Sequence, residues 1–299
     1  MIYFCADDYG ISKLCNDRIE ECLDNGALNK VSVLPNGELT DFKKRLSGKA
    51  DRISLHINLV EGHSLAAPKD IPLLVTEQGY FRYSFVGLLF HSLFGKRKEM
   101  EKQLYKELQS QISFWKQHMG EDHPLYIDSH QHTHMIPLIF KTLMRVIKDE
   151  QLKVERIRIP DEPLLPYLLT PSLYTSYSLS GLAKQWLIKL LALANRRELK
   201  KSGLEYPYFM GLLFSGHLTE EKIRKVLPRY IKIAEKRGKN IEIGFHPGYV
   251  EAEESLMDGY RKGFEHFYFS PWRKKEHDTL MQLKCQVKST KEGFEYALH

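Results

Sequence analysis

The stretch IYFCADDYG, residues 2–10, stands almost at the start of the chain. Its first half is a short apolar run typical of a buried strand, and the run ends in two adjacent carboxylates, Asp7 and Asp8. Like charges side by side cost free energy unless a positive group lies between or beside them. The stretch therefore predicts a strand that delivers two carboxylates to a cation, and it raises the question of whether that cation is a metal ion.

Six further apolar, β-branched or aromatic runs follow along the chain. With the first they give seven expected strands, over residues 2–6, 31–34, 53–59, 125–129, 154–159, 208–213 and 241–246. Helical patterns separate several of these runs, and such alternation implies parallel strands joined by crossovers. The sequence therefore predicts an α/β fold, either a (β/α) barrel or an open doubly wound sheet. No glycine-rich phosphate loop follows the first strand, which disfavours a nucleotide-binding sheet.

Several of the intervening helices have clear signals. In the first, Ser12 is the expected cap and Gly26 the expected end. Its expected inward residues are Leu14, Ile19, Cys22 and Leu23. Apolar residues at helical spacing predict a second helix over about 99–119 and a third over about 219–238. Residues 85–94 are apolar throughout and are expected to form a short helix.

One domain is expected over residues 1–299, since the chain shows no internal repeat and no low-complexity linker. Its least regular part is an apolar helical insertion at about 162–206. Within 162–195 the sequence is rich in leucine, and it ends in an amphipathic pattern of Leu182, Trp186, Leu187, Leu190 and Leu191 against Lys184 and Lys189. Four interpretations stay open: a helix packed on the barrel, a membrane-surface element, a groove for a lipidic substrate, or a dimer contact.

The composition is that of an ordinary globular protein, with 42% hydrophobic and 27% charged residues. The net charge of +6 is spread evenly along the chain, so we expect no nucleic-acid partner. The four cysteines form no C-x-x-C pair, which argues against a zinc ribbon or a redox motif. No signal peptide precedes the first strand, and no apolar stretch is long enough to cross a membrane. We therefore expect a cytoplasmic protein with free thiols.

Polar side chains collect where the expected strands end. They are Asp7 and Asp8 after the first strand, His56 and Asn58 on the polar side of the third, Asp128, His130, His132 and His134 in the stretch DSHQHTHM (128–135) at the end of the fourth, Arg158 near the end of the fifth and His246 after the seventh. In a parallel barrel all these ends share one rim, and active sites form at that rim. The pattern therefore predicts one site built from distant parts of the chain.

Three imidazoles and one carboxylate occur within residues 128–134. Such a cluster is costly to bury without a cation or a hydrogen-bond network, so it predicts a metal site. A mixed Asp and His site suits Zn²⁺ or another divalent ion, and residue types alone do not decide between them. Three protein ligands would leave positions open for water and substrate, which is the catalytic arrangement. A neighbouring carboxylate can then take a proton and a histidine across the site can return one.

At these residues the chain resembles the YdjC-like carbohydrate deacetylase family. The stretches ADDYG (6–10), SLHINLVEG (54–62) and YIDSHQHTHM (126–135) are similar to its motifs, and RIRIPDEP (156–163) and EIGFHPG (242–248) match its later blocks in the expected order. The resemblance implies a distorted seven-stranded (β/α) barrel. It also implies an enzyme that removes acetyl from an N-acetylated amino sugar or glycoconjugate, with one divalent ion, Mg²⁺ or Zn²⁺, as its cofactor. A homodimer is a further suggestion of the family.

The resemblance implies a role for each site residue. The implied metal ligands are Asp8, His56 and His130. Asp7 would be the base that activates the water held by the metal, Arg158 would orient Asp7, and His246 would protonate the leaving amine. One ion cannot use all four histidines. Supporting or substrate-contacting roles are therefore implied for His132, His134, Asp128, Asn58 and Glu61.

Two features of the chain differ from the family pattern. Cys5 stands where the family usually has Asn, and the segment 162–206 is longer and more apolar than the family's loop there. Rival functions are another metal-dependent hydrolase, such as a phosphoesterase or an N-deacylase of a lipid-linked sugar, and a non-catalytic metal-containing protein that binds sugar or lipid. The pair of Asp7 and His246 favours an enzyme, because pure binding has no use for a base and an acid.

Overall fold

Seven parallel strands form one curled sheet in the computed structural model, which describes residues 1–251, 255–260, 265–283, 285–290 and 293–298. The strands are β1 (Ile2–Tyr9), β2 (Lys30–Val33), β3 (Ile53–Ile57), β4 (Leu125–Ser129), β5 (Val154–Ile157), β6 (Tyr208–Met210) and β7 (Ile241–Phe245). Each expected strand is present, and the prediction of an α/β fold with a distorted seven-stranded barrel is confirmed. The residues of β2, β3 and β7 are all buried, as expected for parallel strands covered on both faces.

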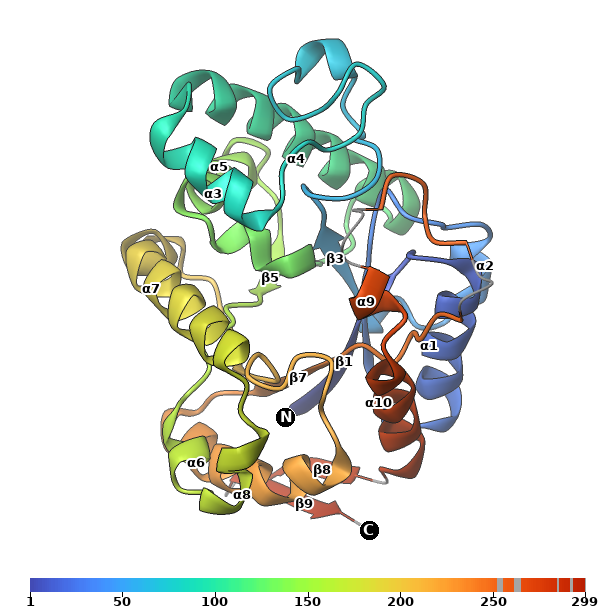
Figure 1. Ribbon diagram of the computed structural model, residues 1–299, viewed down its shortest axis with the longest axis vertical. Helices are drawn as coiled ribbons and strands as arrows, with labels where there is room; N and C mark the ends of the chain where they lie inside the picture. Colours follow the sequence, from blue (N-terminus) through green and yellow to red (C-terminus); the bar gives the residue numbers. More distant parts are fainter. Residues whose placement is uncertain (252–254, 261–264, 284, 291–292, 299) are drawn as a thin grey trace.

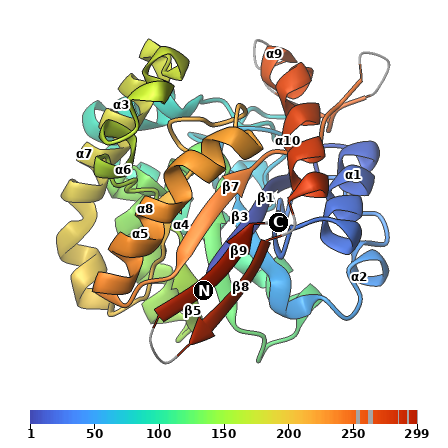
Figure 2. The ribbon, with the colours of Figure 1, turned by 90° about the horizontal axis from the view of Figure 1, so that it is seen from below.

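Helices surround the sheet, and Figure 1 shows them as a ring about the central strands. They are α1 (Lys13–Asn25), α2 (Phe42–Arg45), α3 (Phe85–Phe94), α4 (Arg97–Met119), α5 (Pro137–Asp149), α6 (Leu165–Leu168), α7 (Leu179–Ser202), α8 (Glu220–Arg237), α9 (Glu265–Tyr268) and α10 (Pro271–Gln282). Short 3-10 turns are η1 (Ala50–Arg52), η2 (Pro68–Asp70), η3 (His130–Met135) and η4 (Pro171–Ser176). An antiparallel hairpin of β8 (Cys285–Thr290) and β9 (Gly293–Leu298) contacts α8 and is seen in front in Figure 2.

The sheet is nearly, but not fully, closed. Its strand order is β5-β4-β3-β2-β1-β7-β6, so β5 and β6 are the two edges. Among the described residues these edges meet through one parallel bridge, Arg156 to Glu205, with the Ile157 amide 3.2 Å from the Glu205 carbonyl oxygen. The carboxyl ends of all seven strands point to one side, so the loops after them form a common rim. That rim is where the site residues of the sequence are brought together.

Helix α1 begins at the Ser12 cap, whose hydroxyl accepts from the Cys15 amide, and it ends at Gly26 as expected. The expectation that Leu14 points inward is wrong, because this side chain is 44% exposed. The buried face instead contains Cys15, Asn16, Ile19, Cys22 and Leu23. Leu14 lies outside that face.

The insertion at 162–206 contains α6, η4 and α7. The amphipathic pattern expected for α7 is only partly realised, because Trp186 and Leu190 are exposed while Leu191 is buried. The inward face of the helix carries polar residues that form hydrogen bonds with buried groups of the domain. Gln185 donates to Glu162 at 3.3 Å and Asn195 donates to the Met135 carbonyl at 2.8 Å. These bonds fix the rotation of α7 and leave large apolar side chains facing outward.

Three of the four cysteines, Cys5, Cys15 and Cys22, are buried free thiols, and the side chain of Cys285 lies outside the described residues. None of the helices formed by the described residues combines the length and the hydropathy needed to cross a bilayer.

Candidate active site

The end of β1 brings two adjacent carboxylates to one cavity. Neighbouring residues of a strand normally point to opposite faces. Here the pairing of β1 with β2 shifts between Ala6 and Tyr9, and Asp8 has a left-handed backbone with φ of 71°. Such a conformation is strained by about 1–3 kcal/mol in residues other than glycine and is concentrated at functional sites. This irregularity allows Asp7 and Asp8 to line the same cavity.

The cavity has a volume of about 120 Å³ and lies at the rim of the barrel. Its walls are Asp7, Asp8, His56, His130, Gln131, His132, Lys184, Ser215, His246 and Phe267. Pockets that take a whole small ligand have roughly 300–1,000 Å³. This cavity therefore has room for one substituent of a larger molecule, whose remainder would lie on the rim outside.

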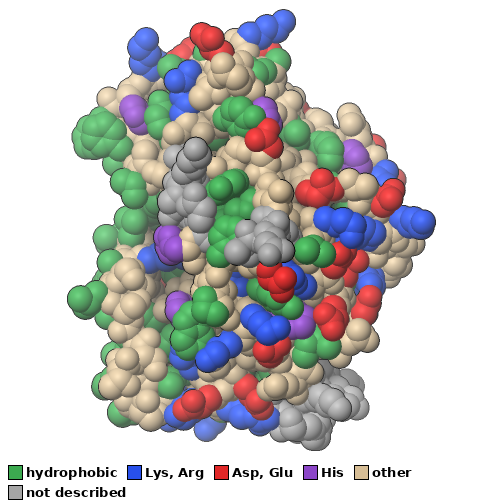
Figure 3. Space-filling model, turned by 45° about the vertical axis from the view of Figure 1, so that its right-hand side comes forward, with side chains coloured by type: hydrophobic (Ala, Val, Ile, Leu, Met, Phe, Trp, Pro, Cys, Tyr) green, Lys and Arg blue, Asp and Glu red, His purple; other side chains and the backbone are tan. Residues whose placement is uncertain are grey.

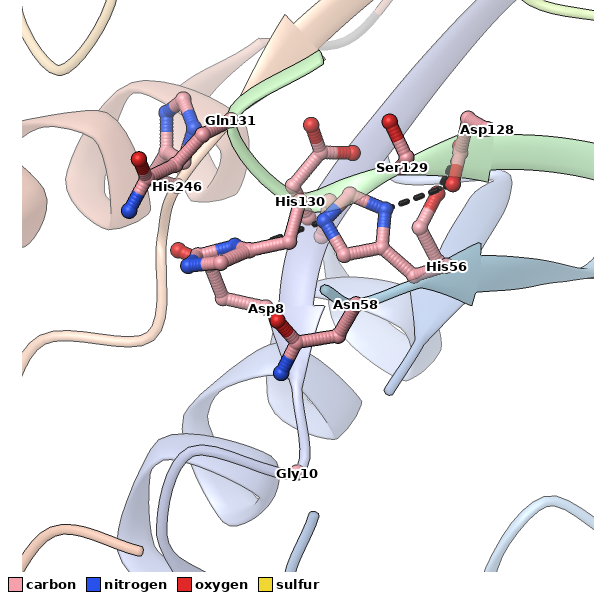
Figure 4. A network of polar contacts seen from close by, with 12 residues as sticks. Asp8, Gly10, His56, Asn58, Asp128, Ser129, His130, Gln131 and His246 are labelled. Atoms are coloured by element: carbon pink, nitrogen blue, oxygen red, sulfur yellow. Dashed lines mark hydrogen bonds and ion pairs between the residues drawn. The ribbon is translucent and has the colours of Figure 1, made fainter. Parts of the chain in front are cut away.

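Three side chains in the cavity are positioned as a metal-binding group. One ligand atom from each of Asp8, His56 and His130 lies within 4.8 Å of the other two, and all three residues are buried. Asp8 Oδ1 lies 2.9 Å from His130 Nδ1 and 3.8 Å from His56 Nε2. Figure 4 shows this group between Asp128 on one side and His246 on the other.

In both histidines the ring nitrogen that faces away from Asp8 has its own polar partner, so the nitrogen that faces Asp8 can bind an ion. Asp128 Oδ1 accepts from His56 Nδ1 at 2.6 Å, which leaves His56 Nε2 facing Asp8. On the far side of His130, Nε2 lies 3.3 Å from the Tyr268 hydroxyl and 3.7 Å from Glu61. Carboxylates in these positions fix the tautomer and orientation of metal-binding histidines. The residues therefore fit a divalent ion held by Asp8, His56 and His130.

Two further sets of three side chains have ligand atoms within 4.8 Å of one another. They are Cys5, Asp128 and Glu242, and Asp7, His56 and Asp128. Their cation is already present, because the Arg158 guanidinium lies among them. It donates to Asp7 Oδ2 at 2.7 Å and Asp7 Oδ1 at 2.9 Å, lies 3.0 Å from Asp128 Oδ2, and donates to Glu242 at 2.5 Å. Arg158 is 1% exposed, so one buried positive charge is shared by three carboxylates.

Cys5 also belongs to this cluster. Its sulfur lies 3.2 Å from Arg158 Nη2 and 3.3 Å from the Ser32 hydroxyl. Burial raises the pKa of the Cys5 thiol well above its usual value, so the thiol is neutral at physiological pH. The neutral Cys5 thiol therefore accepts a hydrogen bond from Arg158, although sulfur is a weak acceptor.

His246, after β7, faces the cavity from the side opposite Asp128. Its backbone amide donates to Glu276 Oε2 at 2.6 Å, and its Nδ1 lies 3.7 Å from the same oxygen without a hydrogen bond to any described residue. Glu276 also accepts from the Leu218 amide at 2.8 Å. One turn earlier on α10, Arg273 pairs with Asp8 Oδ2 and is fully buried. Helix α10 thus holds both His246 and one candidate ligand in place.

His132 and Lys184 line the cavity without a charge partner. His132 is 7% exposed, and its Nδ1 has no hydrogen-bond partner among the described residues. The Lys184 ammonium lies 3.4 Å from the Ser215 hydroxyl, and no described carboxylate lies within ion-pair distance of it. Burial, followed by the charge of Lys184, lowers the pKa of His132 well below its usual value, so this ring is neutral. Both side chains are available to a substrate.

Four residues with implied substrate or supporting roles do not line the cavity: Asp128 and Glu61, which lie behind His56 and His130, and also Asn58 and His134. Asn58 is fully buried and holds the loop after β3, where its side chain accepts from the Val60 amide at 3.1 Å and donates to the Glu61 carbonyl at 2.8 Å. His134 bonds the Arg158 carbonyl at 2.7 Å and the Ser129 hydroxyl at 2.5 Å, and so ties β4 to β5. Asn58 and His134 act through the backbone of the segments that carry the site.

Metal binding is expected to displace a proton. Burial lowers the pKa of His130, but the charges of Asp8 and Glu61 outweigh this effect and raise it to about 10. Below that pH the metal-free ring is protonated, and an ion needs it deprotonated. We expect binding at neutral pH to release about one proton, and the apparent affinity to rise about tenfold per pH unit. Titration calorimetry in buffers of different ionisation enthalpy measures the number of protons released.

The control is His277→Ala, which changes a histidine of α10 that pairs with Glu21 outside the cavity and should leave proton release unaltered. A binding enthalpy that is the same in every buffer would contradict the prediction.

Site residues that the sequence did not reveal come mainly from the C-terminal helices, with one from the insertion and one from the loop after β6. They are Lys184 on α7, Ser215 after β6, and Phe267, Tyr268, Arg273 and Glu276 on or near α9 and α10. None stands in a motif, and only the fold brings them to the ends of β1, β4 and β7. Their one sequence signal was the lysine within an otherwise leucine-rich stretch.

The chain is similar in sequence to known carbohydrate deacetylases. A carbohydrate deacetylase of Clostridium beijerinckii is 27% identical over 188 residues, which cover 62% of this chain and 73% of that protein. One of Geobacillus stearothermophilus is 31% identical over 161 residues, 53% of this chain and 58% of that protein. One of Xenopus laevis is 26% identical over 268 residues, 83% of this chain and 81% of that protein.

The fold has a solved counterpart in an Enterococcus faecalis protein described as a cellobiose-phosphate cleavage protein. The two share a TM-score of 0.62 and 19% identity, over 94% of this chain and 90% of the other. The family described as YdjC-like protein matches residues 1–288, which include every residue of the cavity. The chain therefore belongs to the YdjC-like protein family.

Proposed function

We propose that the protein is a metal-dependent carbohydrate deacetylase that hydrolyses the acetamide of an N-acetylated amino sugar or glycoconjugate. The observation that carries the proposal is the single cavity in which a metal-binding group lies beside one carboxylate held by an arginine and one histidine held by a glutamate. The relatives named carbohydrate deacetylase support the same chemistry.

The ligands of the ion would be Asp8, His56 and His130. When bound there, a divalent ion acts as a Lewis acid that polarises a carbonyl and lowers the pKa of water. The two candidate ions are Mg²⁺ and Zn²⁺. The mixed nitrogen and oxygen set favours Zn²⁺ over Mg²⁺, whose preferred ligands are oxygens.

The protein's own residues supply the proton transfers. Asp7, held on both oxygens by Arg158, is positioned to take a proton from the attacking water. The water oxygen bonds to the acetyl carbon and the carbon–nitrogen bond breaks. His246, held through Glu276, gives a proton to the leaving amine. The products are acetate and a free amine, so the reaction needs no further reactant.

The test is acetate release from metal-reconstituted protein. The panel contains N-acetylglucosamine oligomers and lipid-linked N-acetyl sugars, and His130→Ala is the blank because it removes one ligand. Acetate that appears with the wild type and disappears with His130→Ala supports the proposal. The proposal fails if no panel member yields acetate while one divalent ion is bound per chain.

A metal-dependent phosphoesterase is the second candidate, and Lys184 is the observation that favours it. A cation without a carboxylate partner in the cavity suits a phosphate as well as a polar sugar. Phosphate release from sugar phosphates, measured on the same preparations, separates the two candidates. Lys184→Ala should raise KM more than it lowers kcat in either case if Lys184 only binds substrate.

A further inference from the structure

Exposed large hydrophobic side chains are concentrated in two segments of this protein. Fourteen such side chains occur among the described residues, and twelve of them lie in residues 86–94 or 165–193. These are Val86, Phe90, Leu93, Phe94, Leu165, Leu168, Leu169, Tyr174, Leu179, Trp186, Leu190 and Leu193. Single exposed apolar residues are normal, but a concentration on a few helices marks an interaction surface. We call these twelve residues the apolar flank.

The apolar flank is a consequence of how its helices pack. In α3 the buried positions are Leu88 and Ser92, so Phe90 and Phe94 face solvent at 56% and 74% exposure. In α7 the bonded residues Gln185 and Asn195 face inward and turn Trp186 and Leu190 outward. The outward orientation is therefore fixed by the native contacts and does not result from loose packing.

The flank belongs to the same side of the molecule as the cavity. Helix α3 follows β3, and α6 and α7 follow β5, so all three belong to the loops of the catalytic rim. Figures 1 and 2 both place α3 and α7 on the same side of the barrel, and Figure 3 shows hydrophobic side chains standing out along the left edge of the molecule. Helix α7 also contributes Lys184 to the cavity wall, so one helix connects cavity and flank.

Basic residues border the flank at the end of each long segment. Exposed cations there are Lys96, Arg97 and Lys98 after α3, and Arg196, Arg197 and Lys200 on α7. The nearby acidic residues are already neutralised, since Glu99 pairs with Lys102 and Glu198 pairs with Lys201. Apolar and aromatic side chains with flanking lysine and arginine are the pattern of helices that lie in the interface of an anionic bilayer.

We propose that the apolar flank docks this protein on an anionic lipid surface, where the cavity receives the acetamido group of a lipid-anchored amino sugar. The docking stands on the flank itself, whereas the substrate class rests on the proposed deacetylase function. The small cavity agrees with this substrate class, because it has room for only one substituent. The rest of the substrate would lie along α3 and α7.

Charge favours a bilayer over a second copy of the chain as the occupant. A two-fold symmetric dimer brings the same patch of both copies together. Six exposed cations on each copy would then border the same interface, and like charges across an interface cost free energy. A copy seated on α7 would also stand beside the cavity opening. Anionic headgroups, in contrast, complement these cations and carry the substrate.

The experiment is co-sedimentation with vesicles of phosphatidylcholine alone and of phosphatidylcholine with phosphatidylglycerol. The wild type should bind the anionic vesicles. The four-serine variant, Phe90→Ser/Phe94→Ser/Trp186→Ser/Leu190→Ser, should bind at least on the order of tenfold more weakly, because it loses apolar area. The double variant Arg196→Gln/Arg197→Gln should bind anionic vesicles more weakly than the wild type, and its binding should depend less on salt concentration. The matched control is Leu14→Ser, a 44% exposed leucine on α1, which should bind as wild type.

Absence of vesicle binding by the wild type would overturn the docking. So would a dimer, seen by light scattering, that the four-serine variant converts to monomer, since a second copy would then occupy the flank. Vesicle binding is measured on the His130→Ala protein as well, so it does not depend on activity. Docking without acetate release from any member of the panel would refute the proposed function alone. Docking with acetate release from soluble oligomers but not from vesicle-borne N-acetyl sugar would overturn the lipid-anchored substrate. Acetate release from soluble oligomers without docking would refute the flank alone.

Discussion

Asp7→Asn is expected to lower kcat for acetate release by about a thousandfold, within the range that general acid–base catalysis contributes. The amide keeps the shape of Asp7 and one hydrogen bond from Arg158, but it cannot take a proton from water. Asp8, His56 and His130 are unchanged, so metal content, measured by mass spectrometry of the loaded protein, should stay at that of the wild type. Acetate release and metal content are compared on the same preparation.

The matched control is Asp149→Asn, the same chemical change at the exposed end of α5. It should have wild-type activity. If Asp7→Asn retains most of its activity, Asp7 is not the base. If it loses the metal together with activity, Asp7 acts as a ligand, and the division of labour between the two adjacent carboxylates is wrong.

Arg158→Met should destabilise the fold by about 3–5 kcal/mol at neutral pH, because removing one partner of a buried ion pair leaves charge uncompensated. Three carboxylates, Asp7, Asp128 and Glu242, surround the guanidinium, and all are buried. Methionine fills a similar volume, so the loss comes from charge and hydrogen bonds and not from a cavity. Urea unfolding followed by circular dichroism measures the difference.

The sign of the pH dependence gives a second test of this prediction. Burial raises the pKa of the Asp128 carboxyl, and in the wild type the charge of Arg158 helps to hold that pKa below its usual range. Without the arginine, Asp128 therefore binds a proton more readily in the folded than in the unfolded protein. The stability deficit should therefore shrink as the pH falls below neutral. Arg145→Met, which removes an exposed ion pair with Asp149, should cost less than about 1 kcal/mol. An Arg158→Met protein as stable as this control would show that the cluster does not need its cation.

Most of the fold and much of the site could be predicted from the sequence for one physical reason. Parallel strands buried on both faces read as apolar runs, and their carboxyl ends meet at one rim. Polar residues that follow these runs, such as Asp8, His56 and His130, were therefore predicted to meet, and their ligand atoms do lie within 4.8 Å of one another. The resemblance to the YdjC-like family is confirmed as well.

The second layer of the site could not be predicted in the same way. Glu276 and Arg273 lie on a helix whose sequence has no distinctive pattern, and only the packing of α10 brings them to His246 and Asp8. Lys184 was interpreted as part of the polar face of a helix, yet its ammonium faces the cavity. The rotation of α7 depends on Gln185 and Asn195, polar residues that a hydrophobic pattern assigns to the outside.

The incomplete seam between β5 and β6 has a consequence for the mechanics of the barrel. In a fully closed barrel, main-chain hydrogen bonds join the first and last strands along their length. Among the described residues of this protein, a single bridge joins the two edges. Side chains in the lumen, led by Arg158 of the segment after β5, tie that edge to β1 and β7 instead. At this seam the barrel is therefore held together by ion pairs between side chains rather than by main-chain hydrogen bonds. Native-state hydrogen exchange should therefore find the fastest-opening amides of the sheet along this seam.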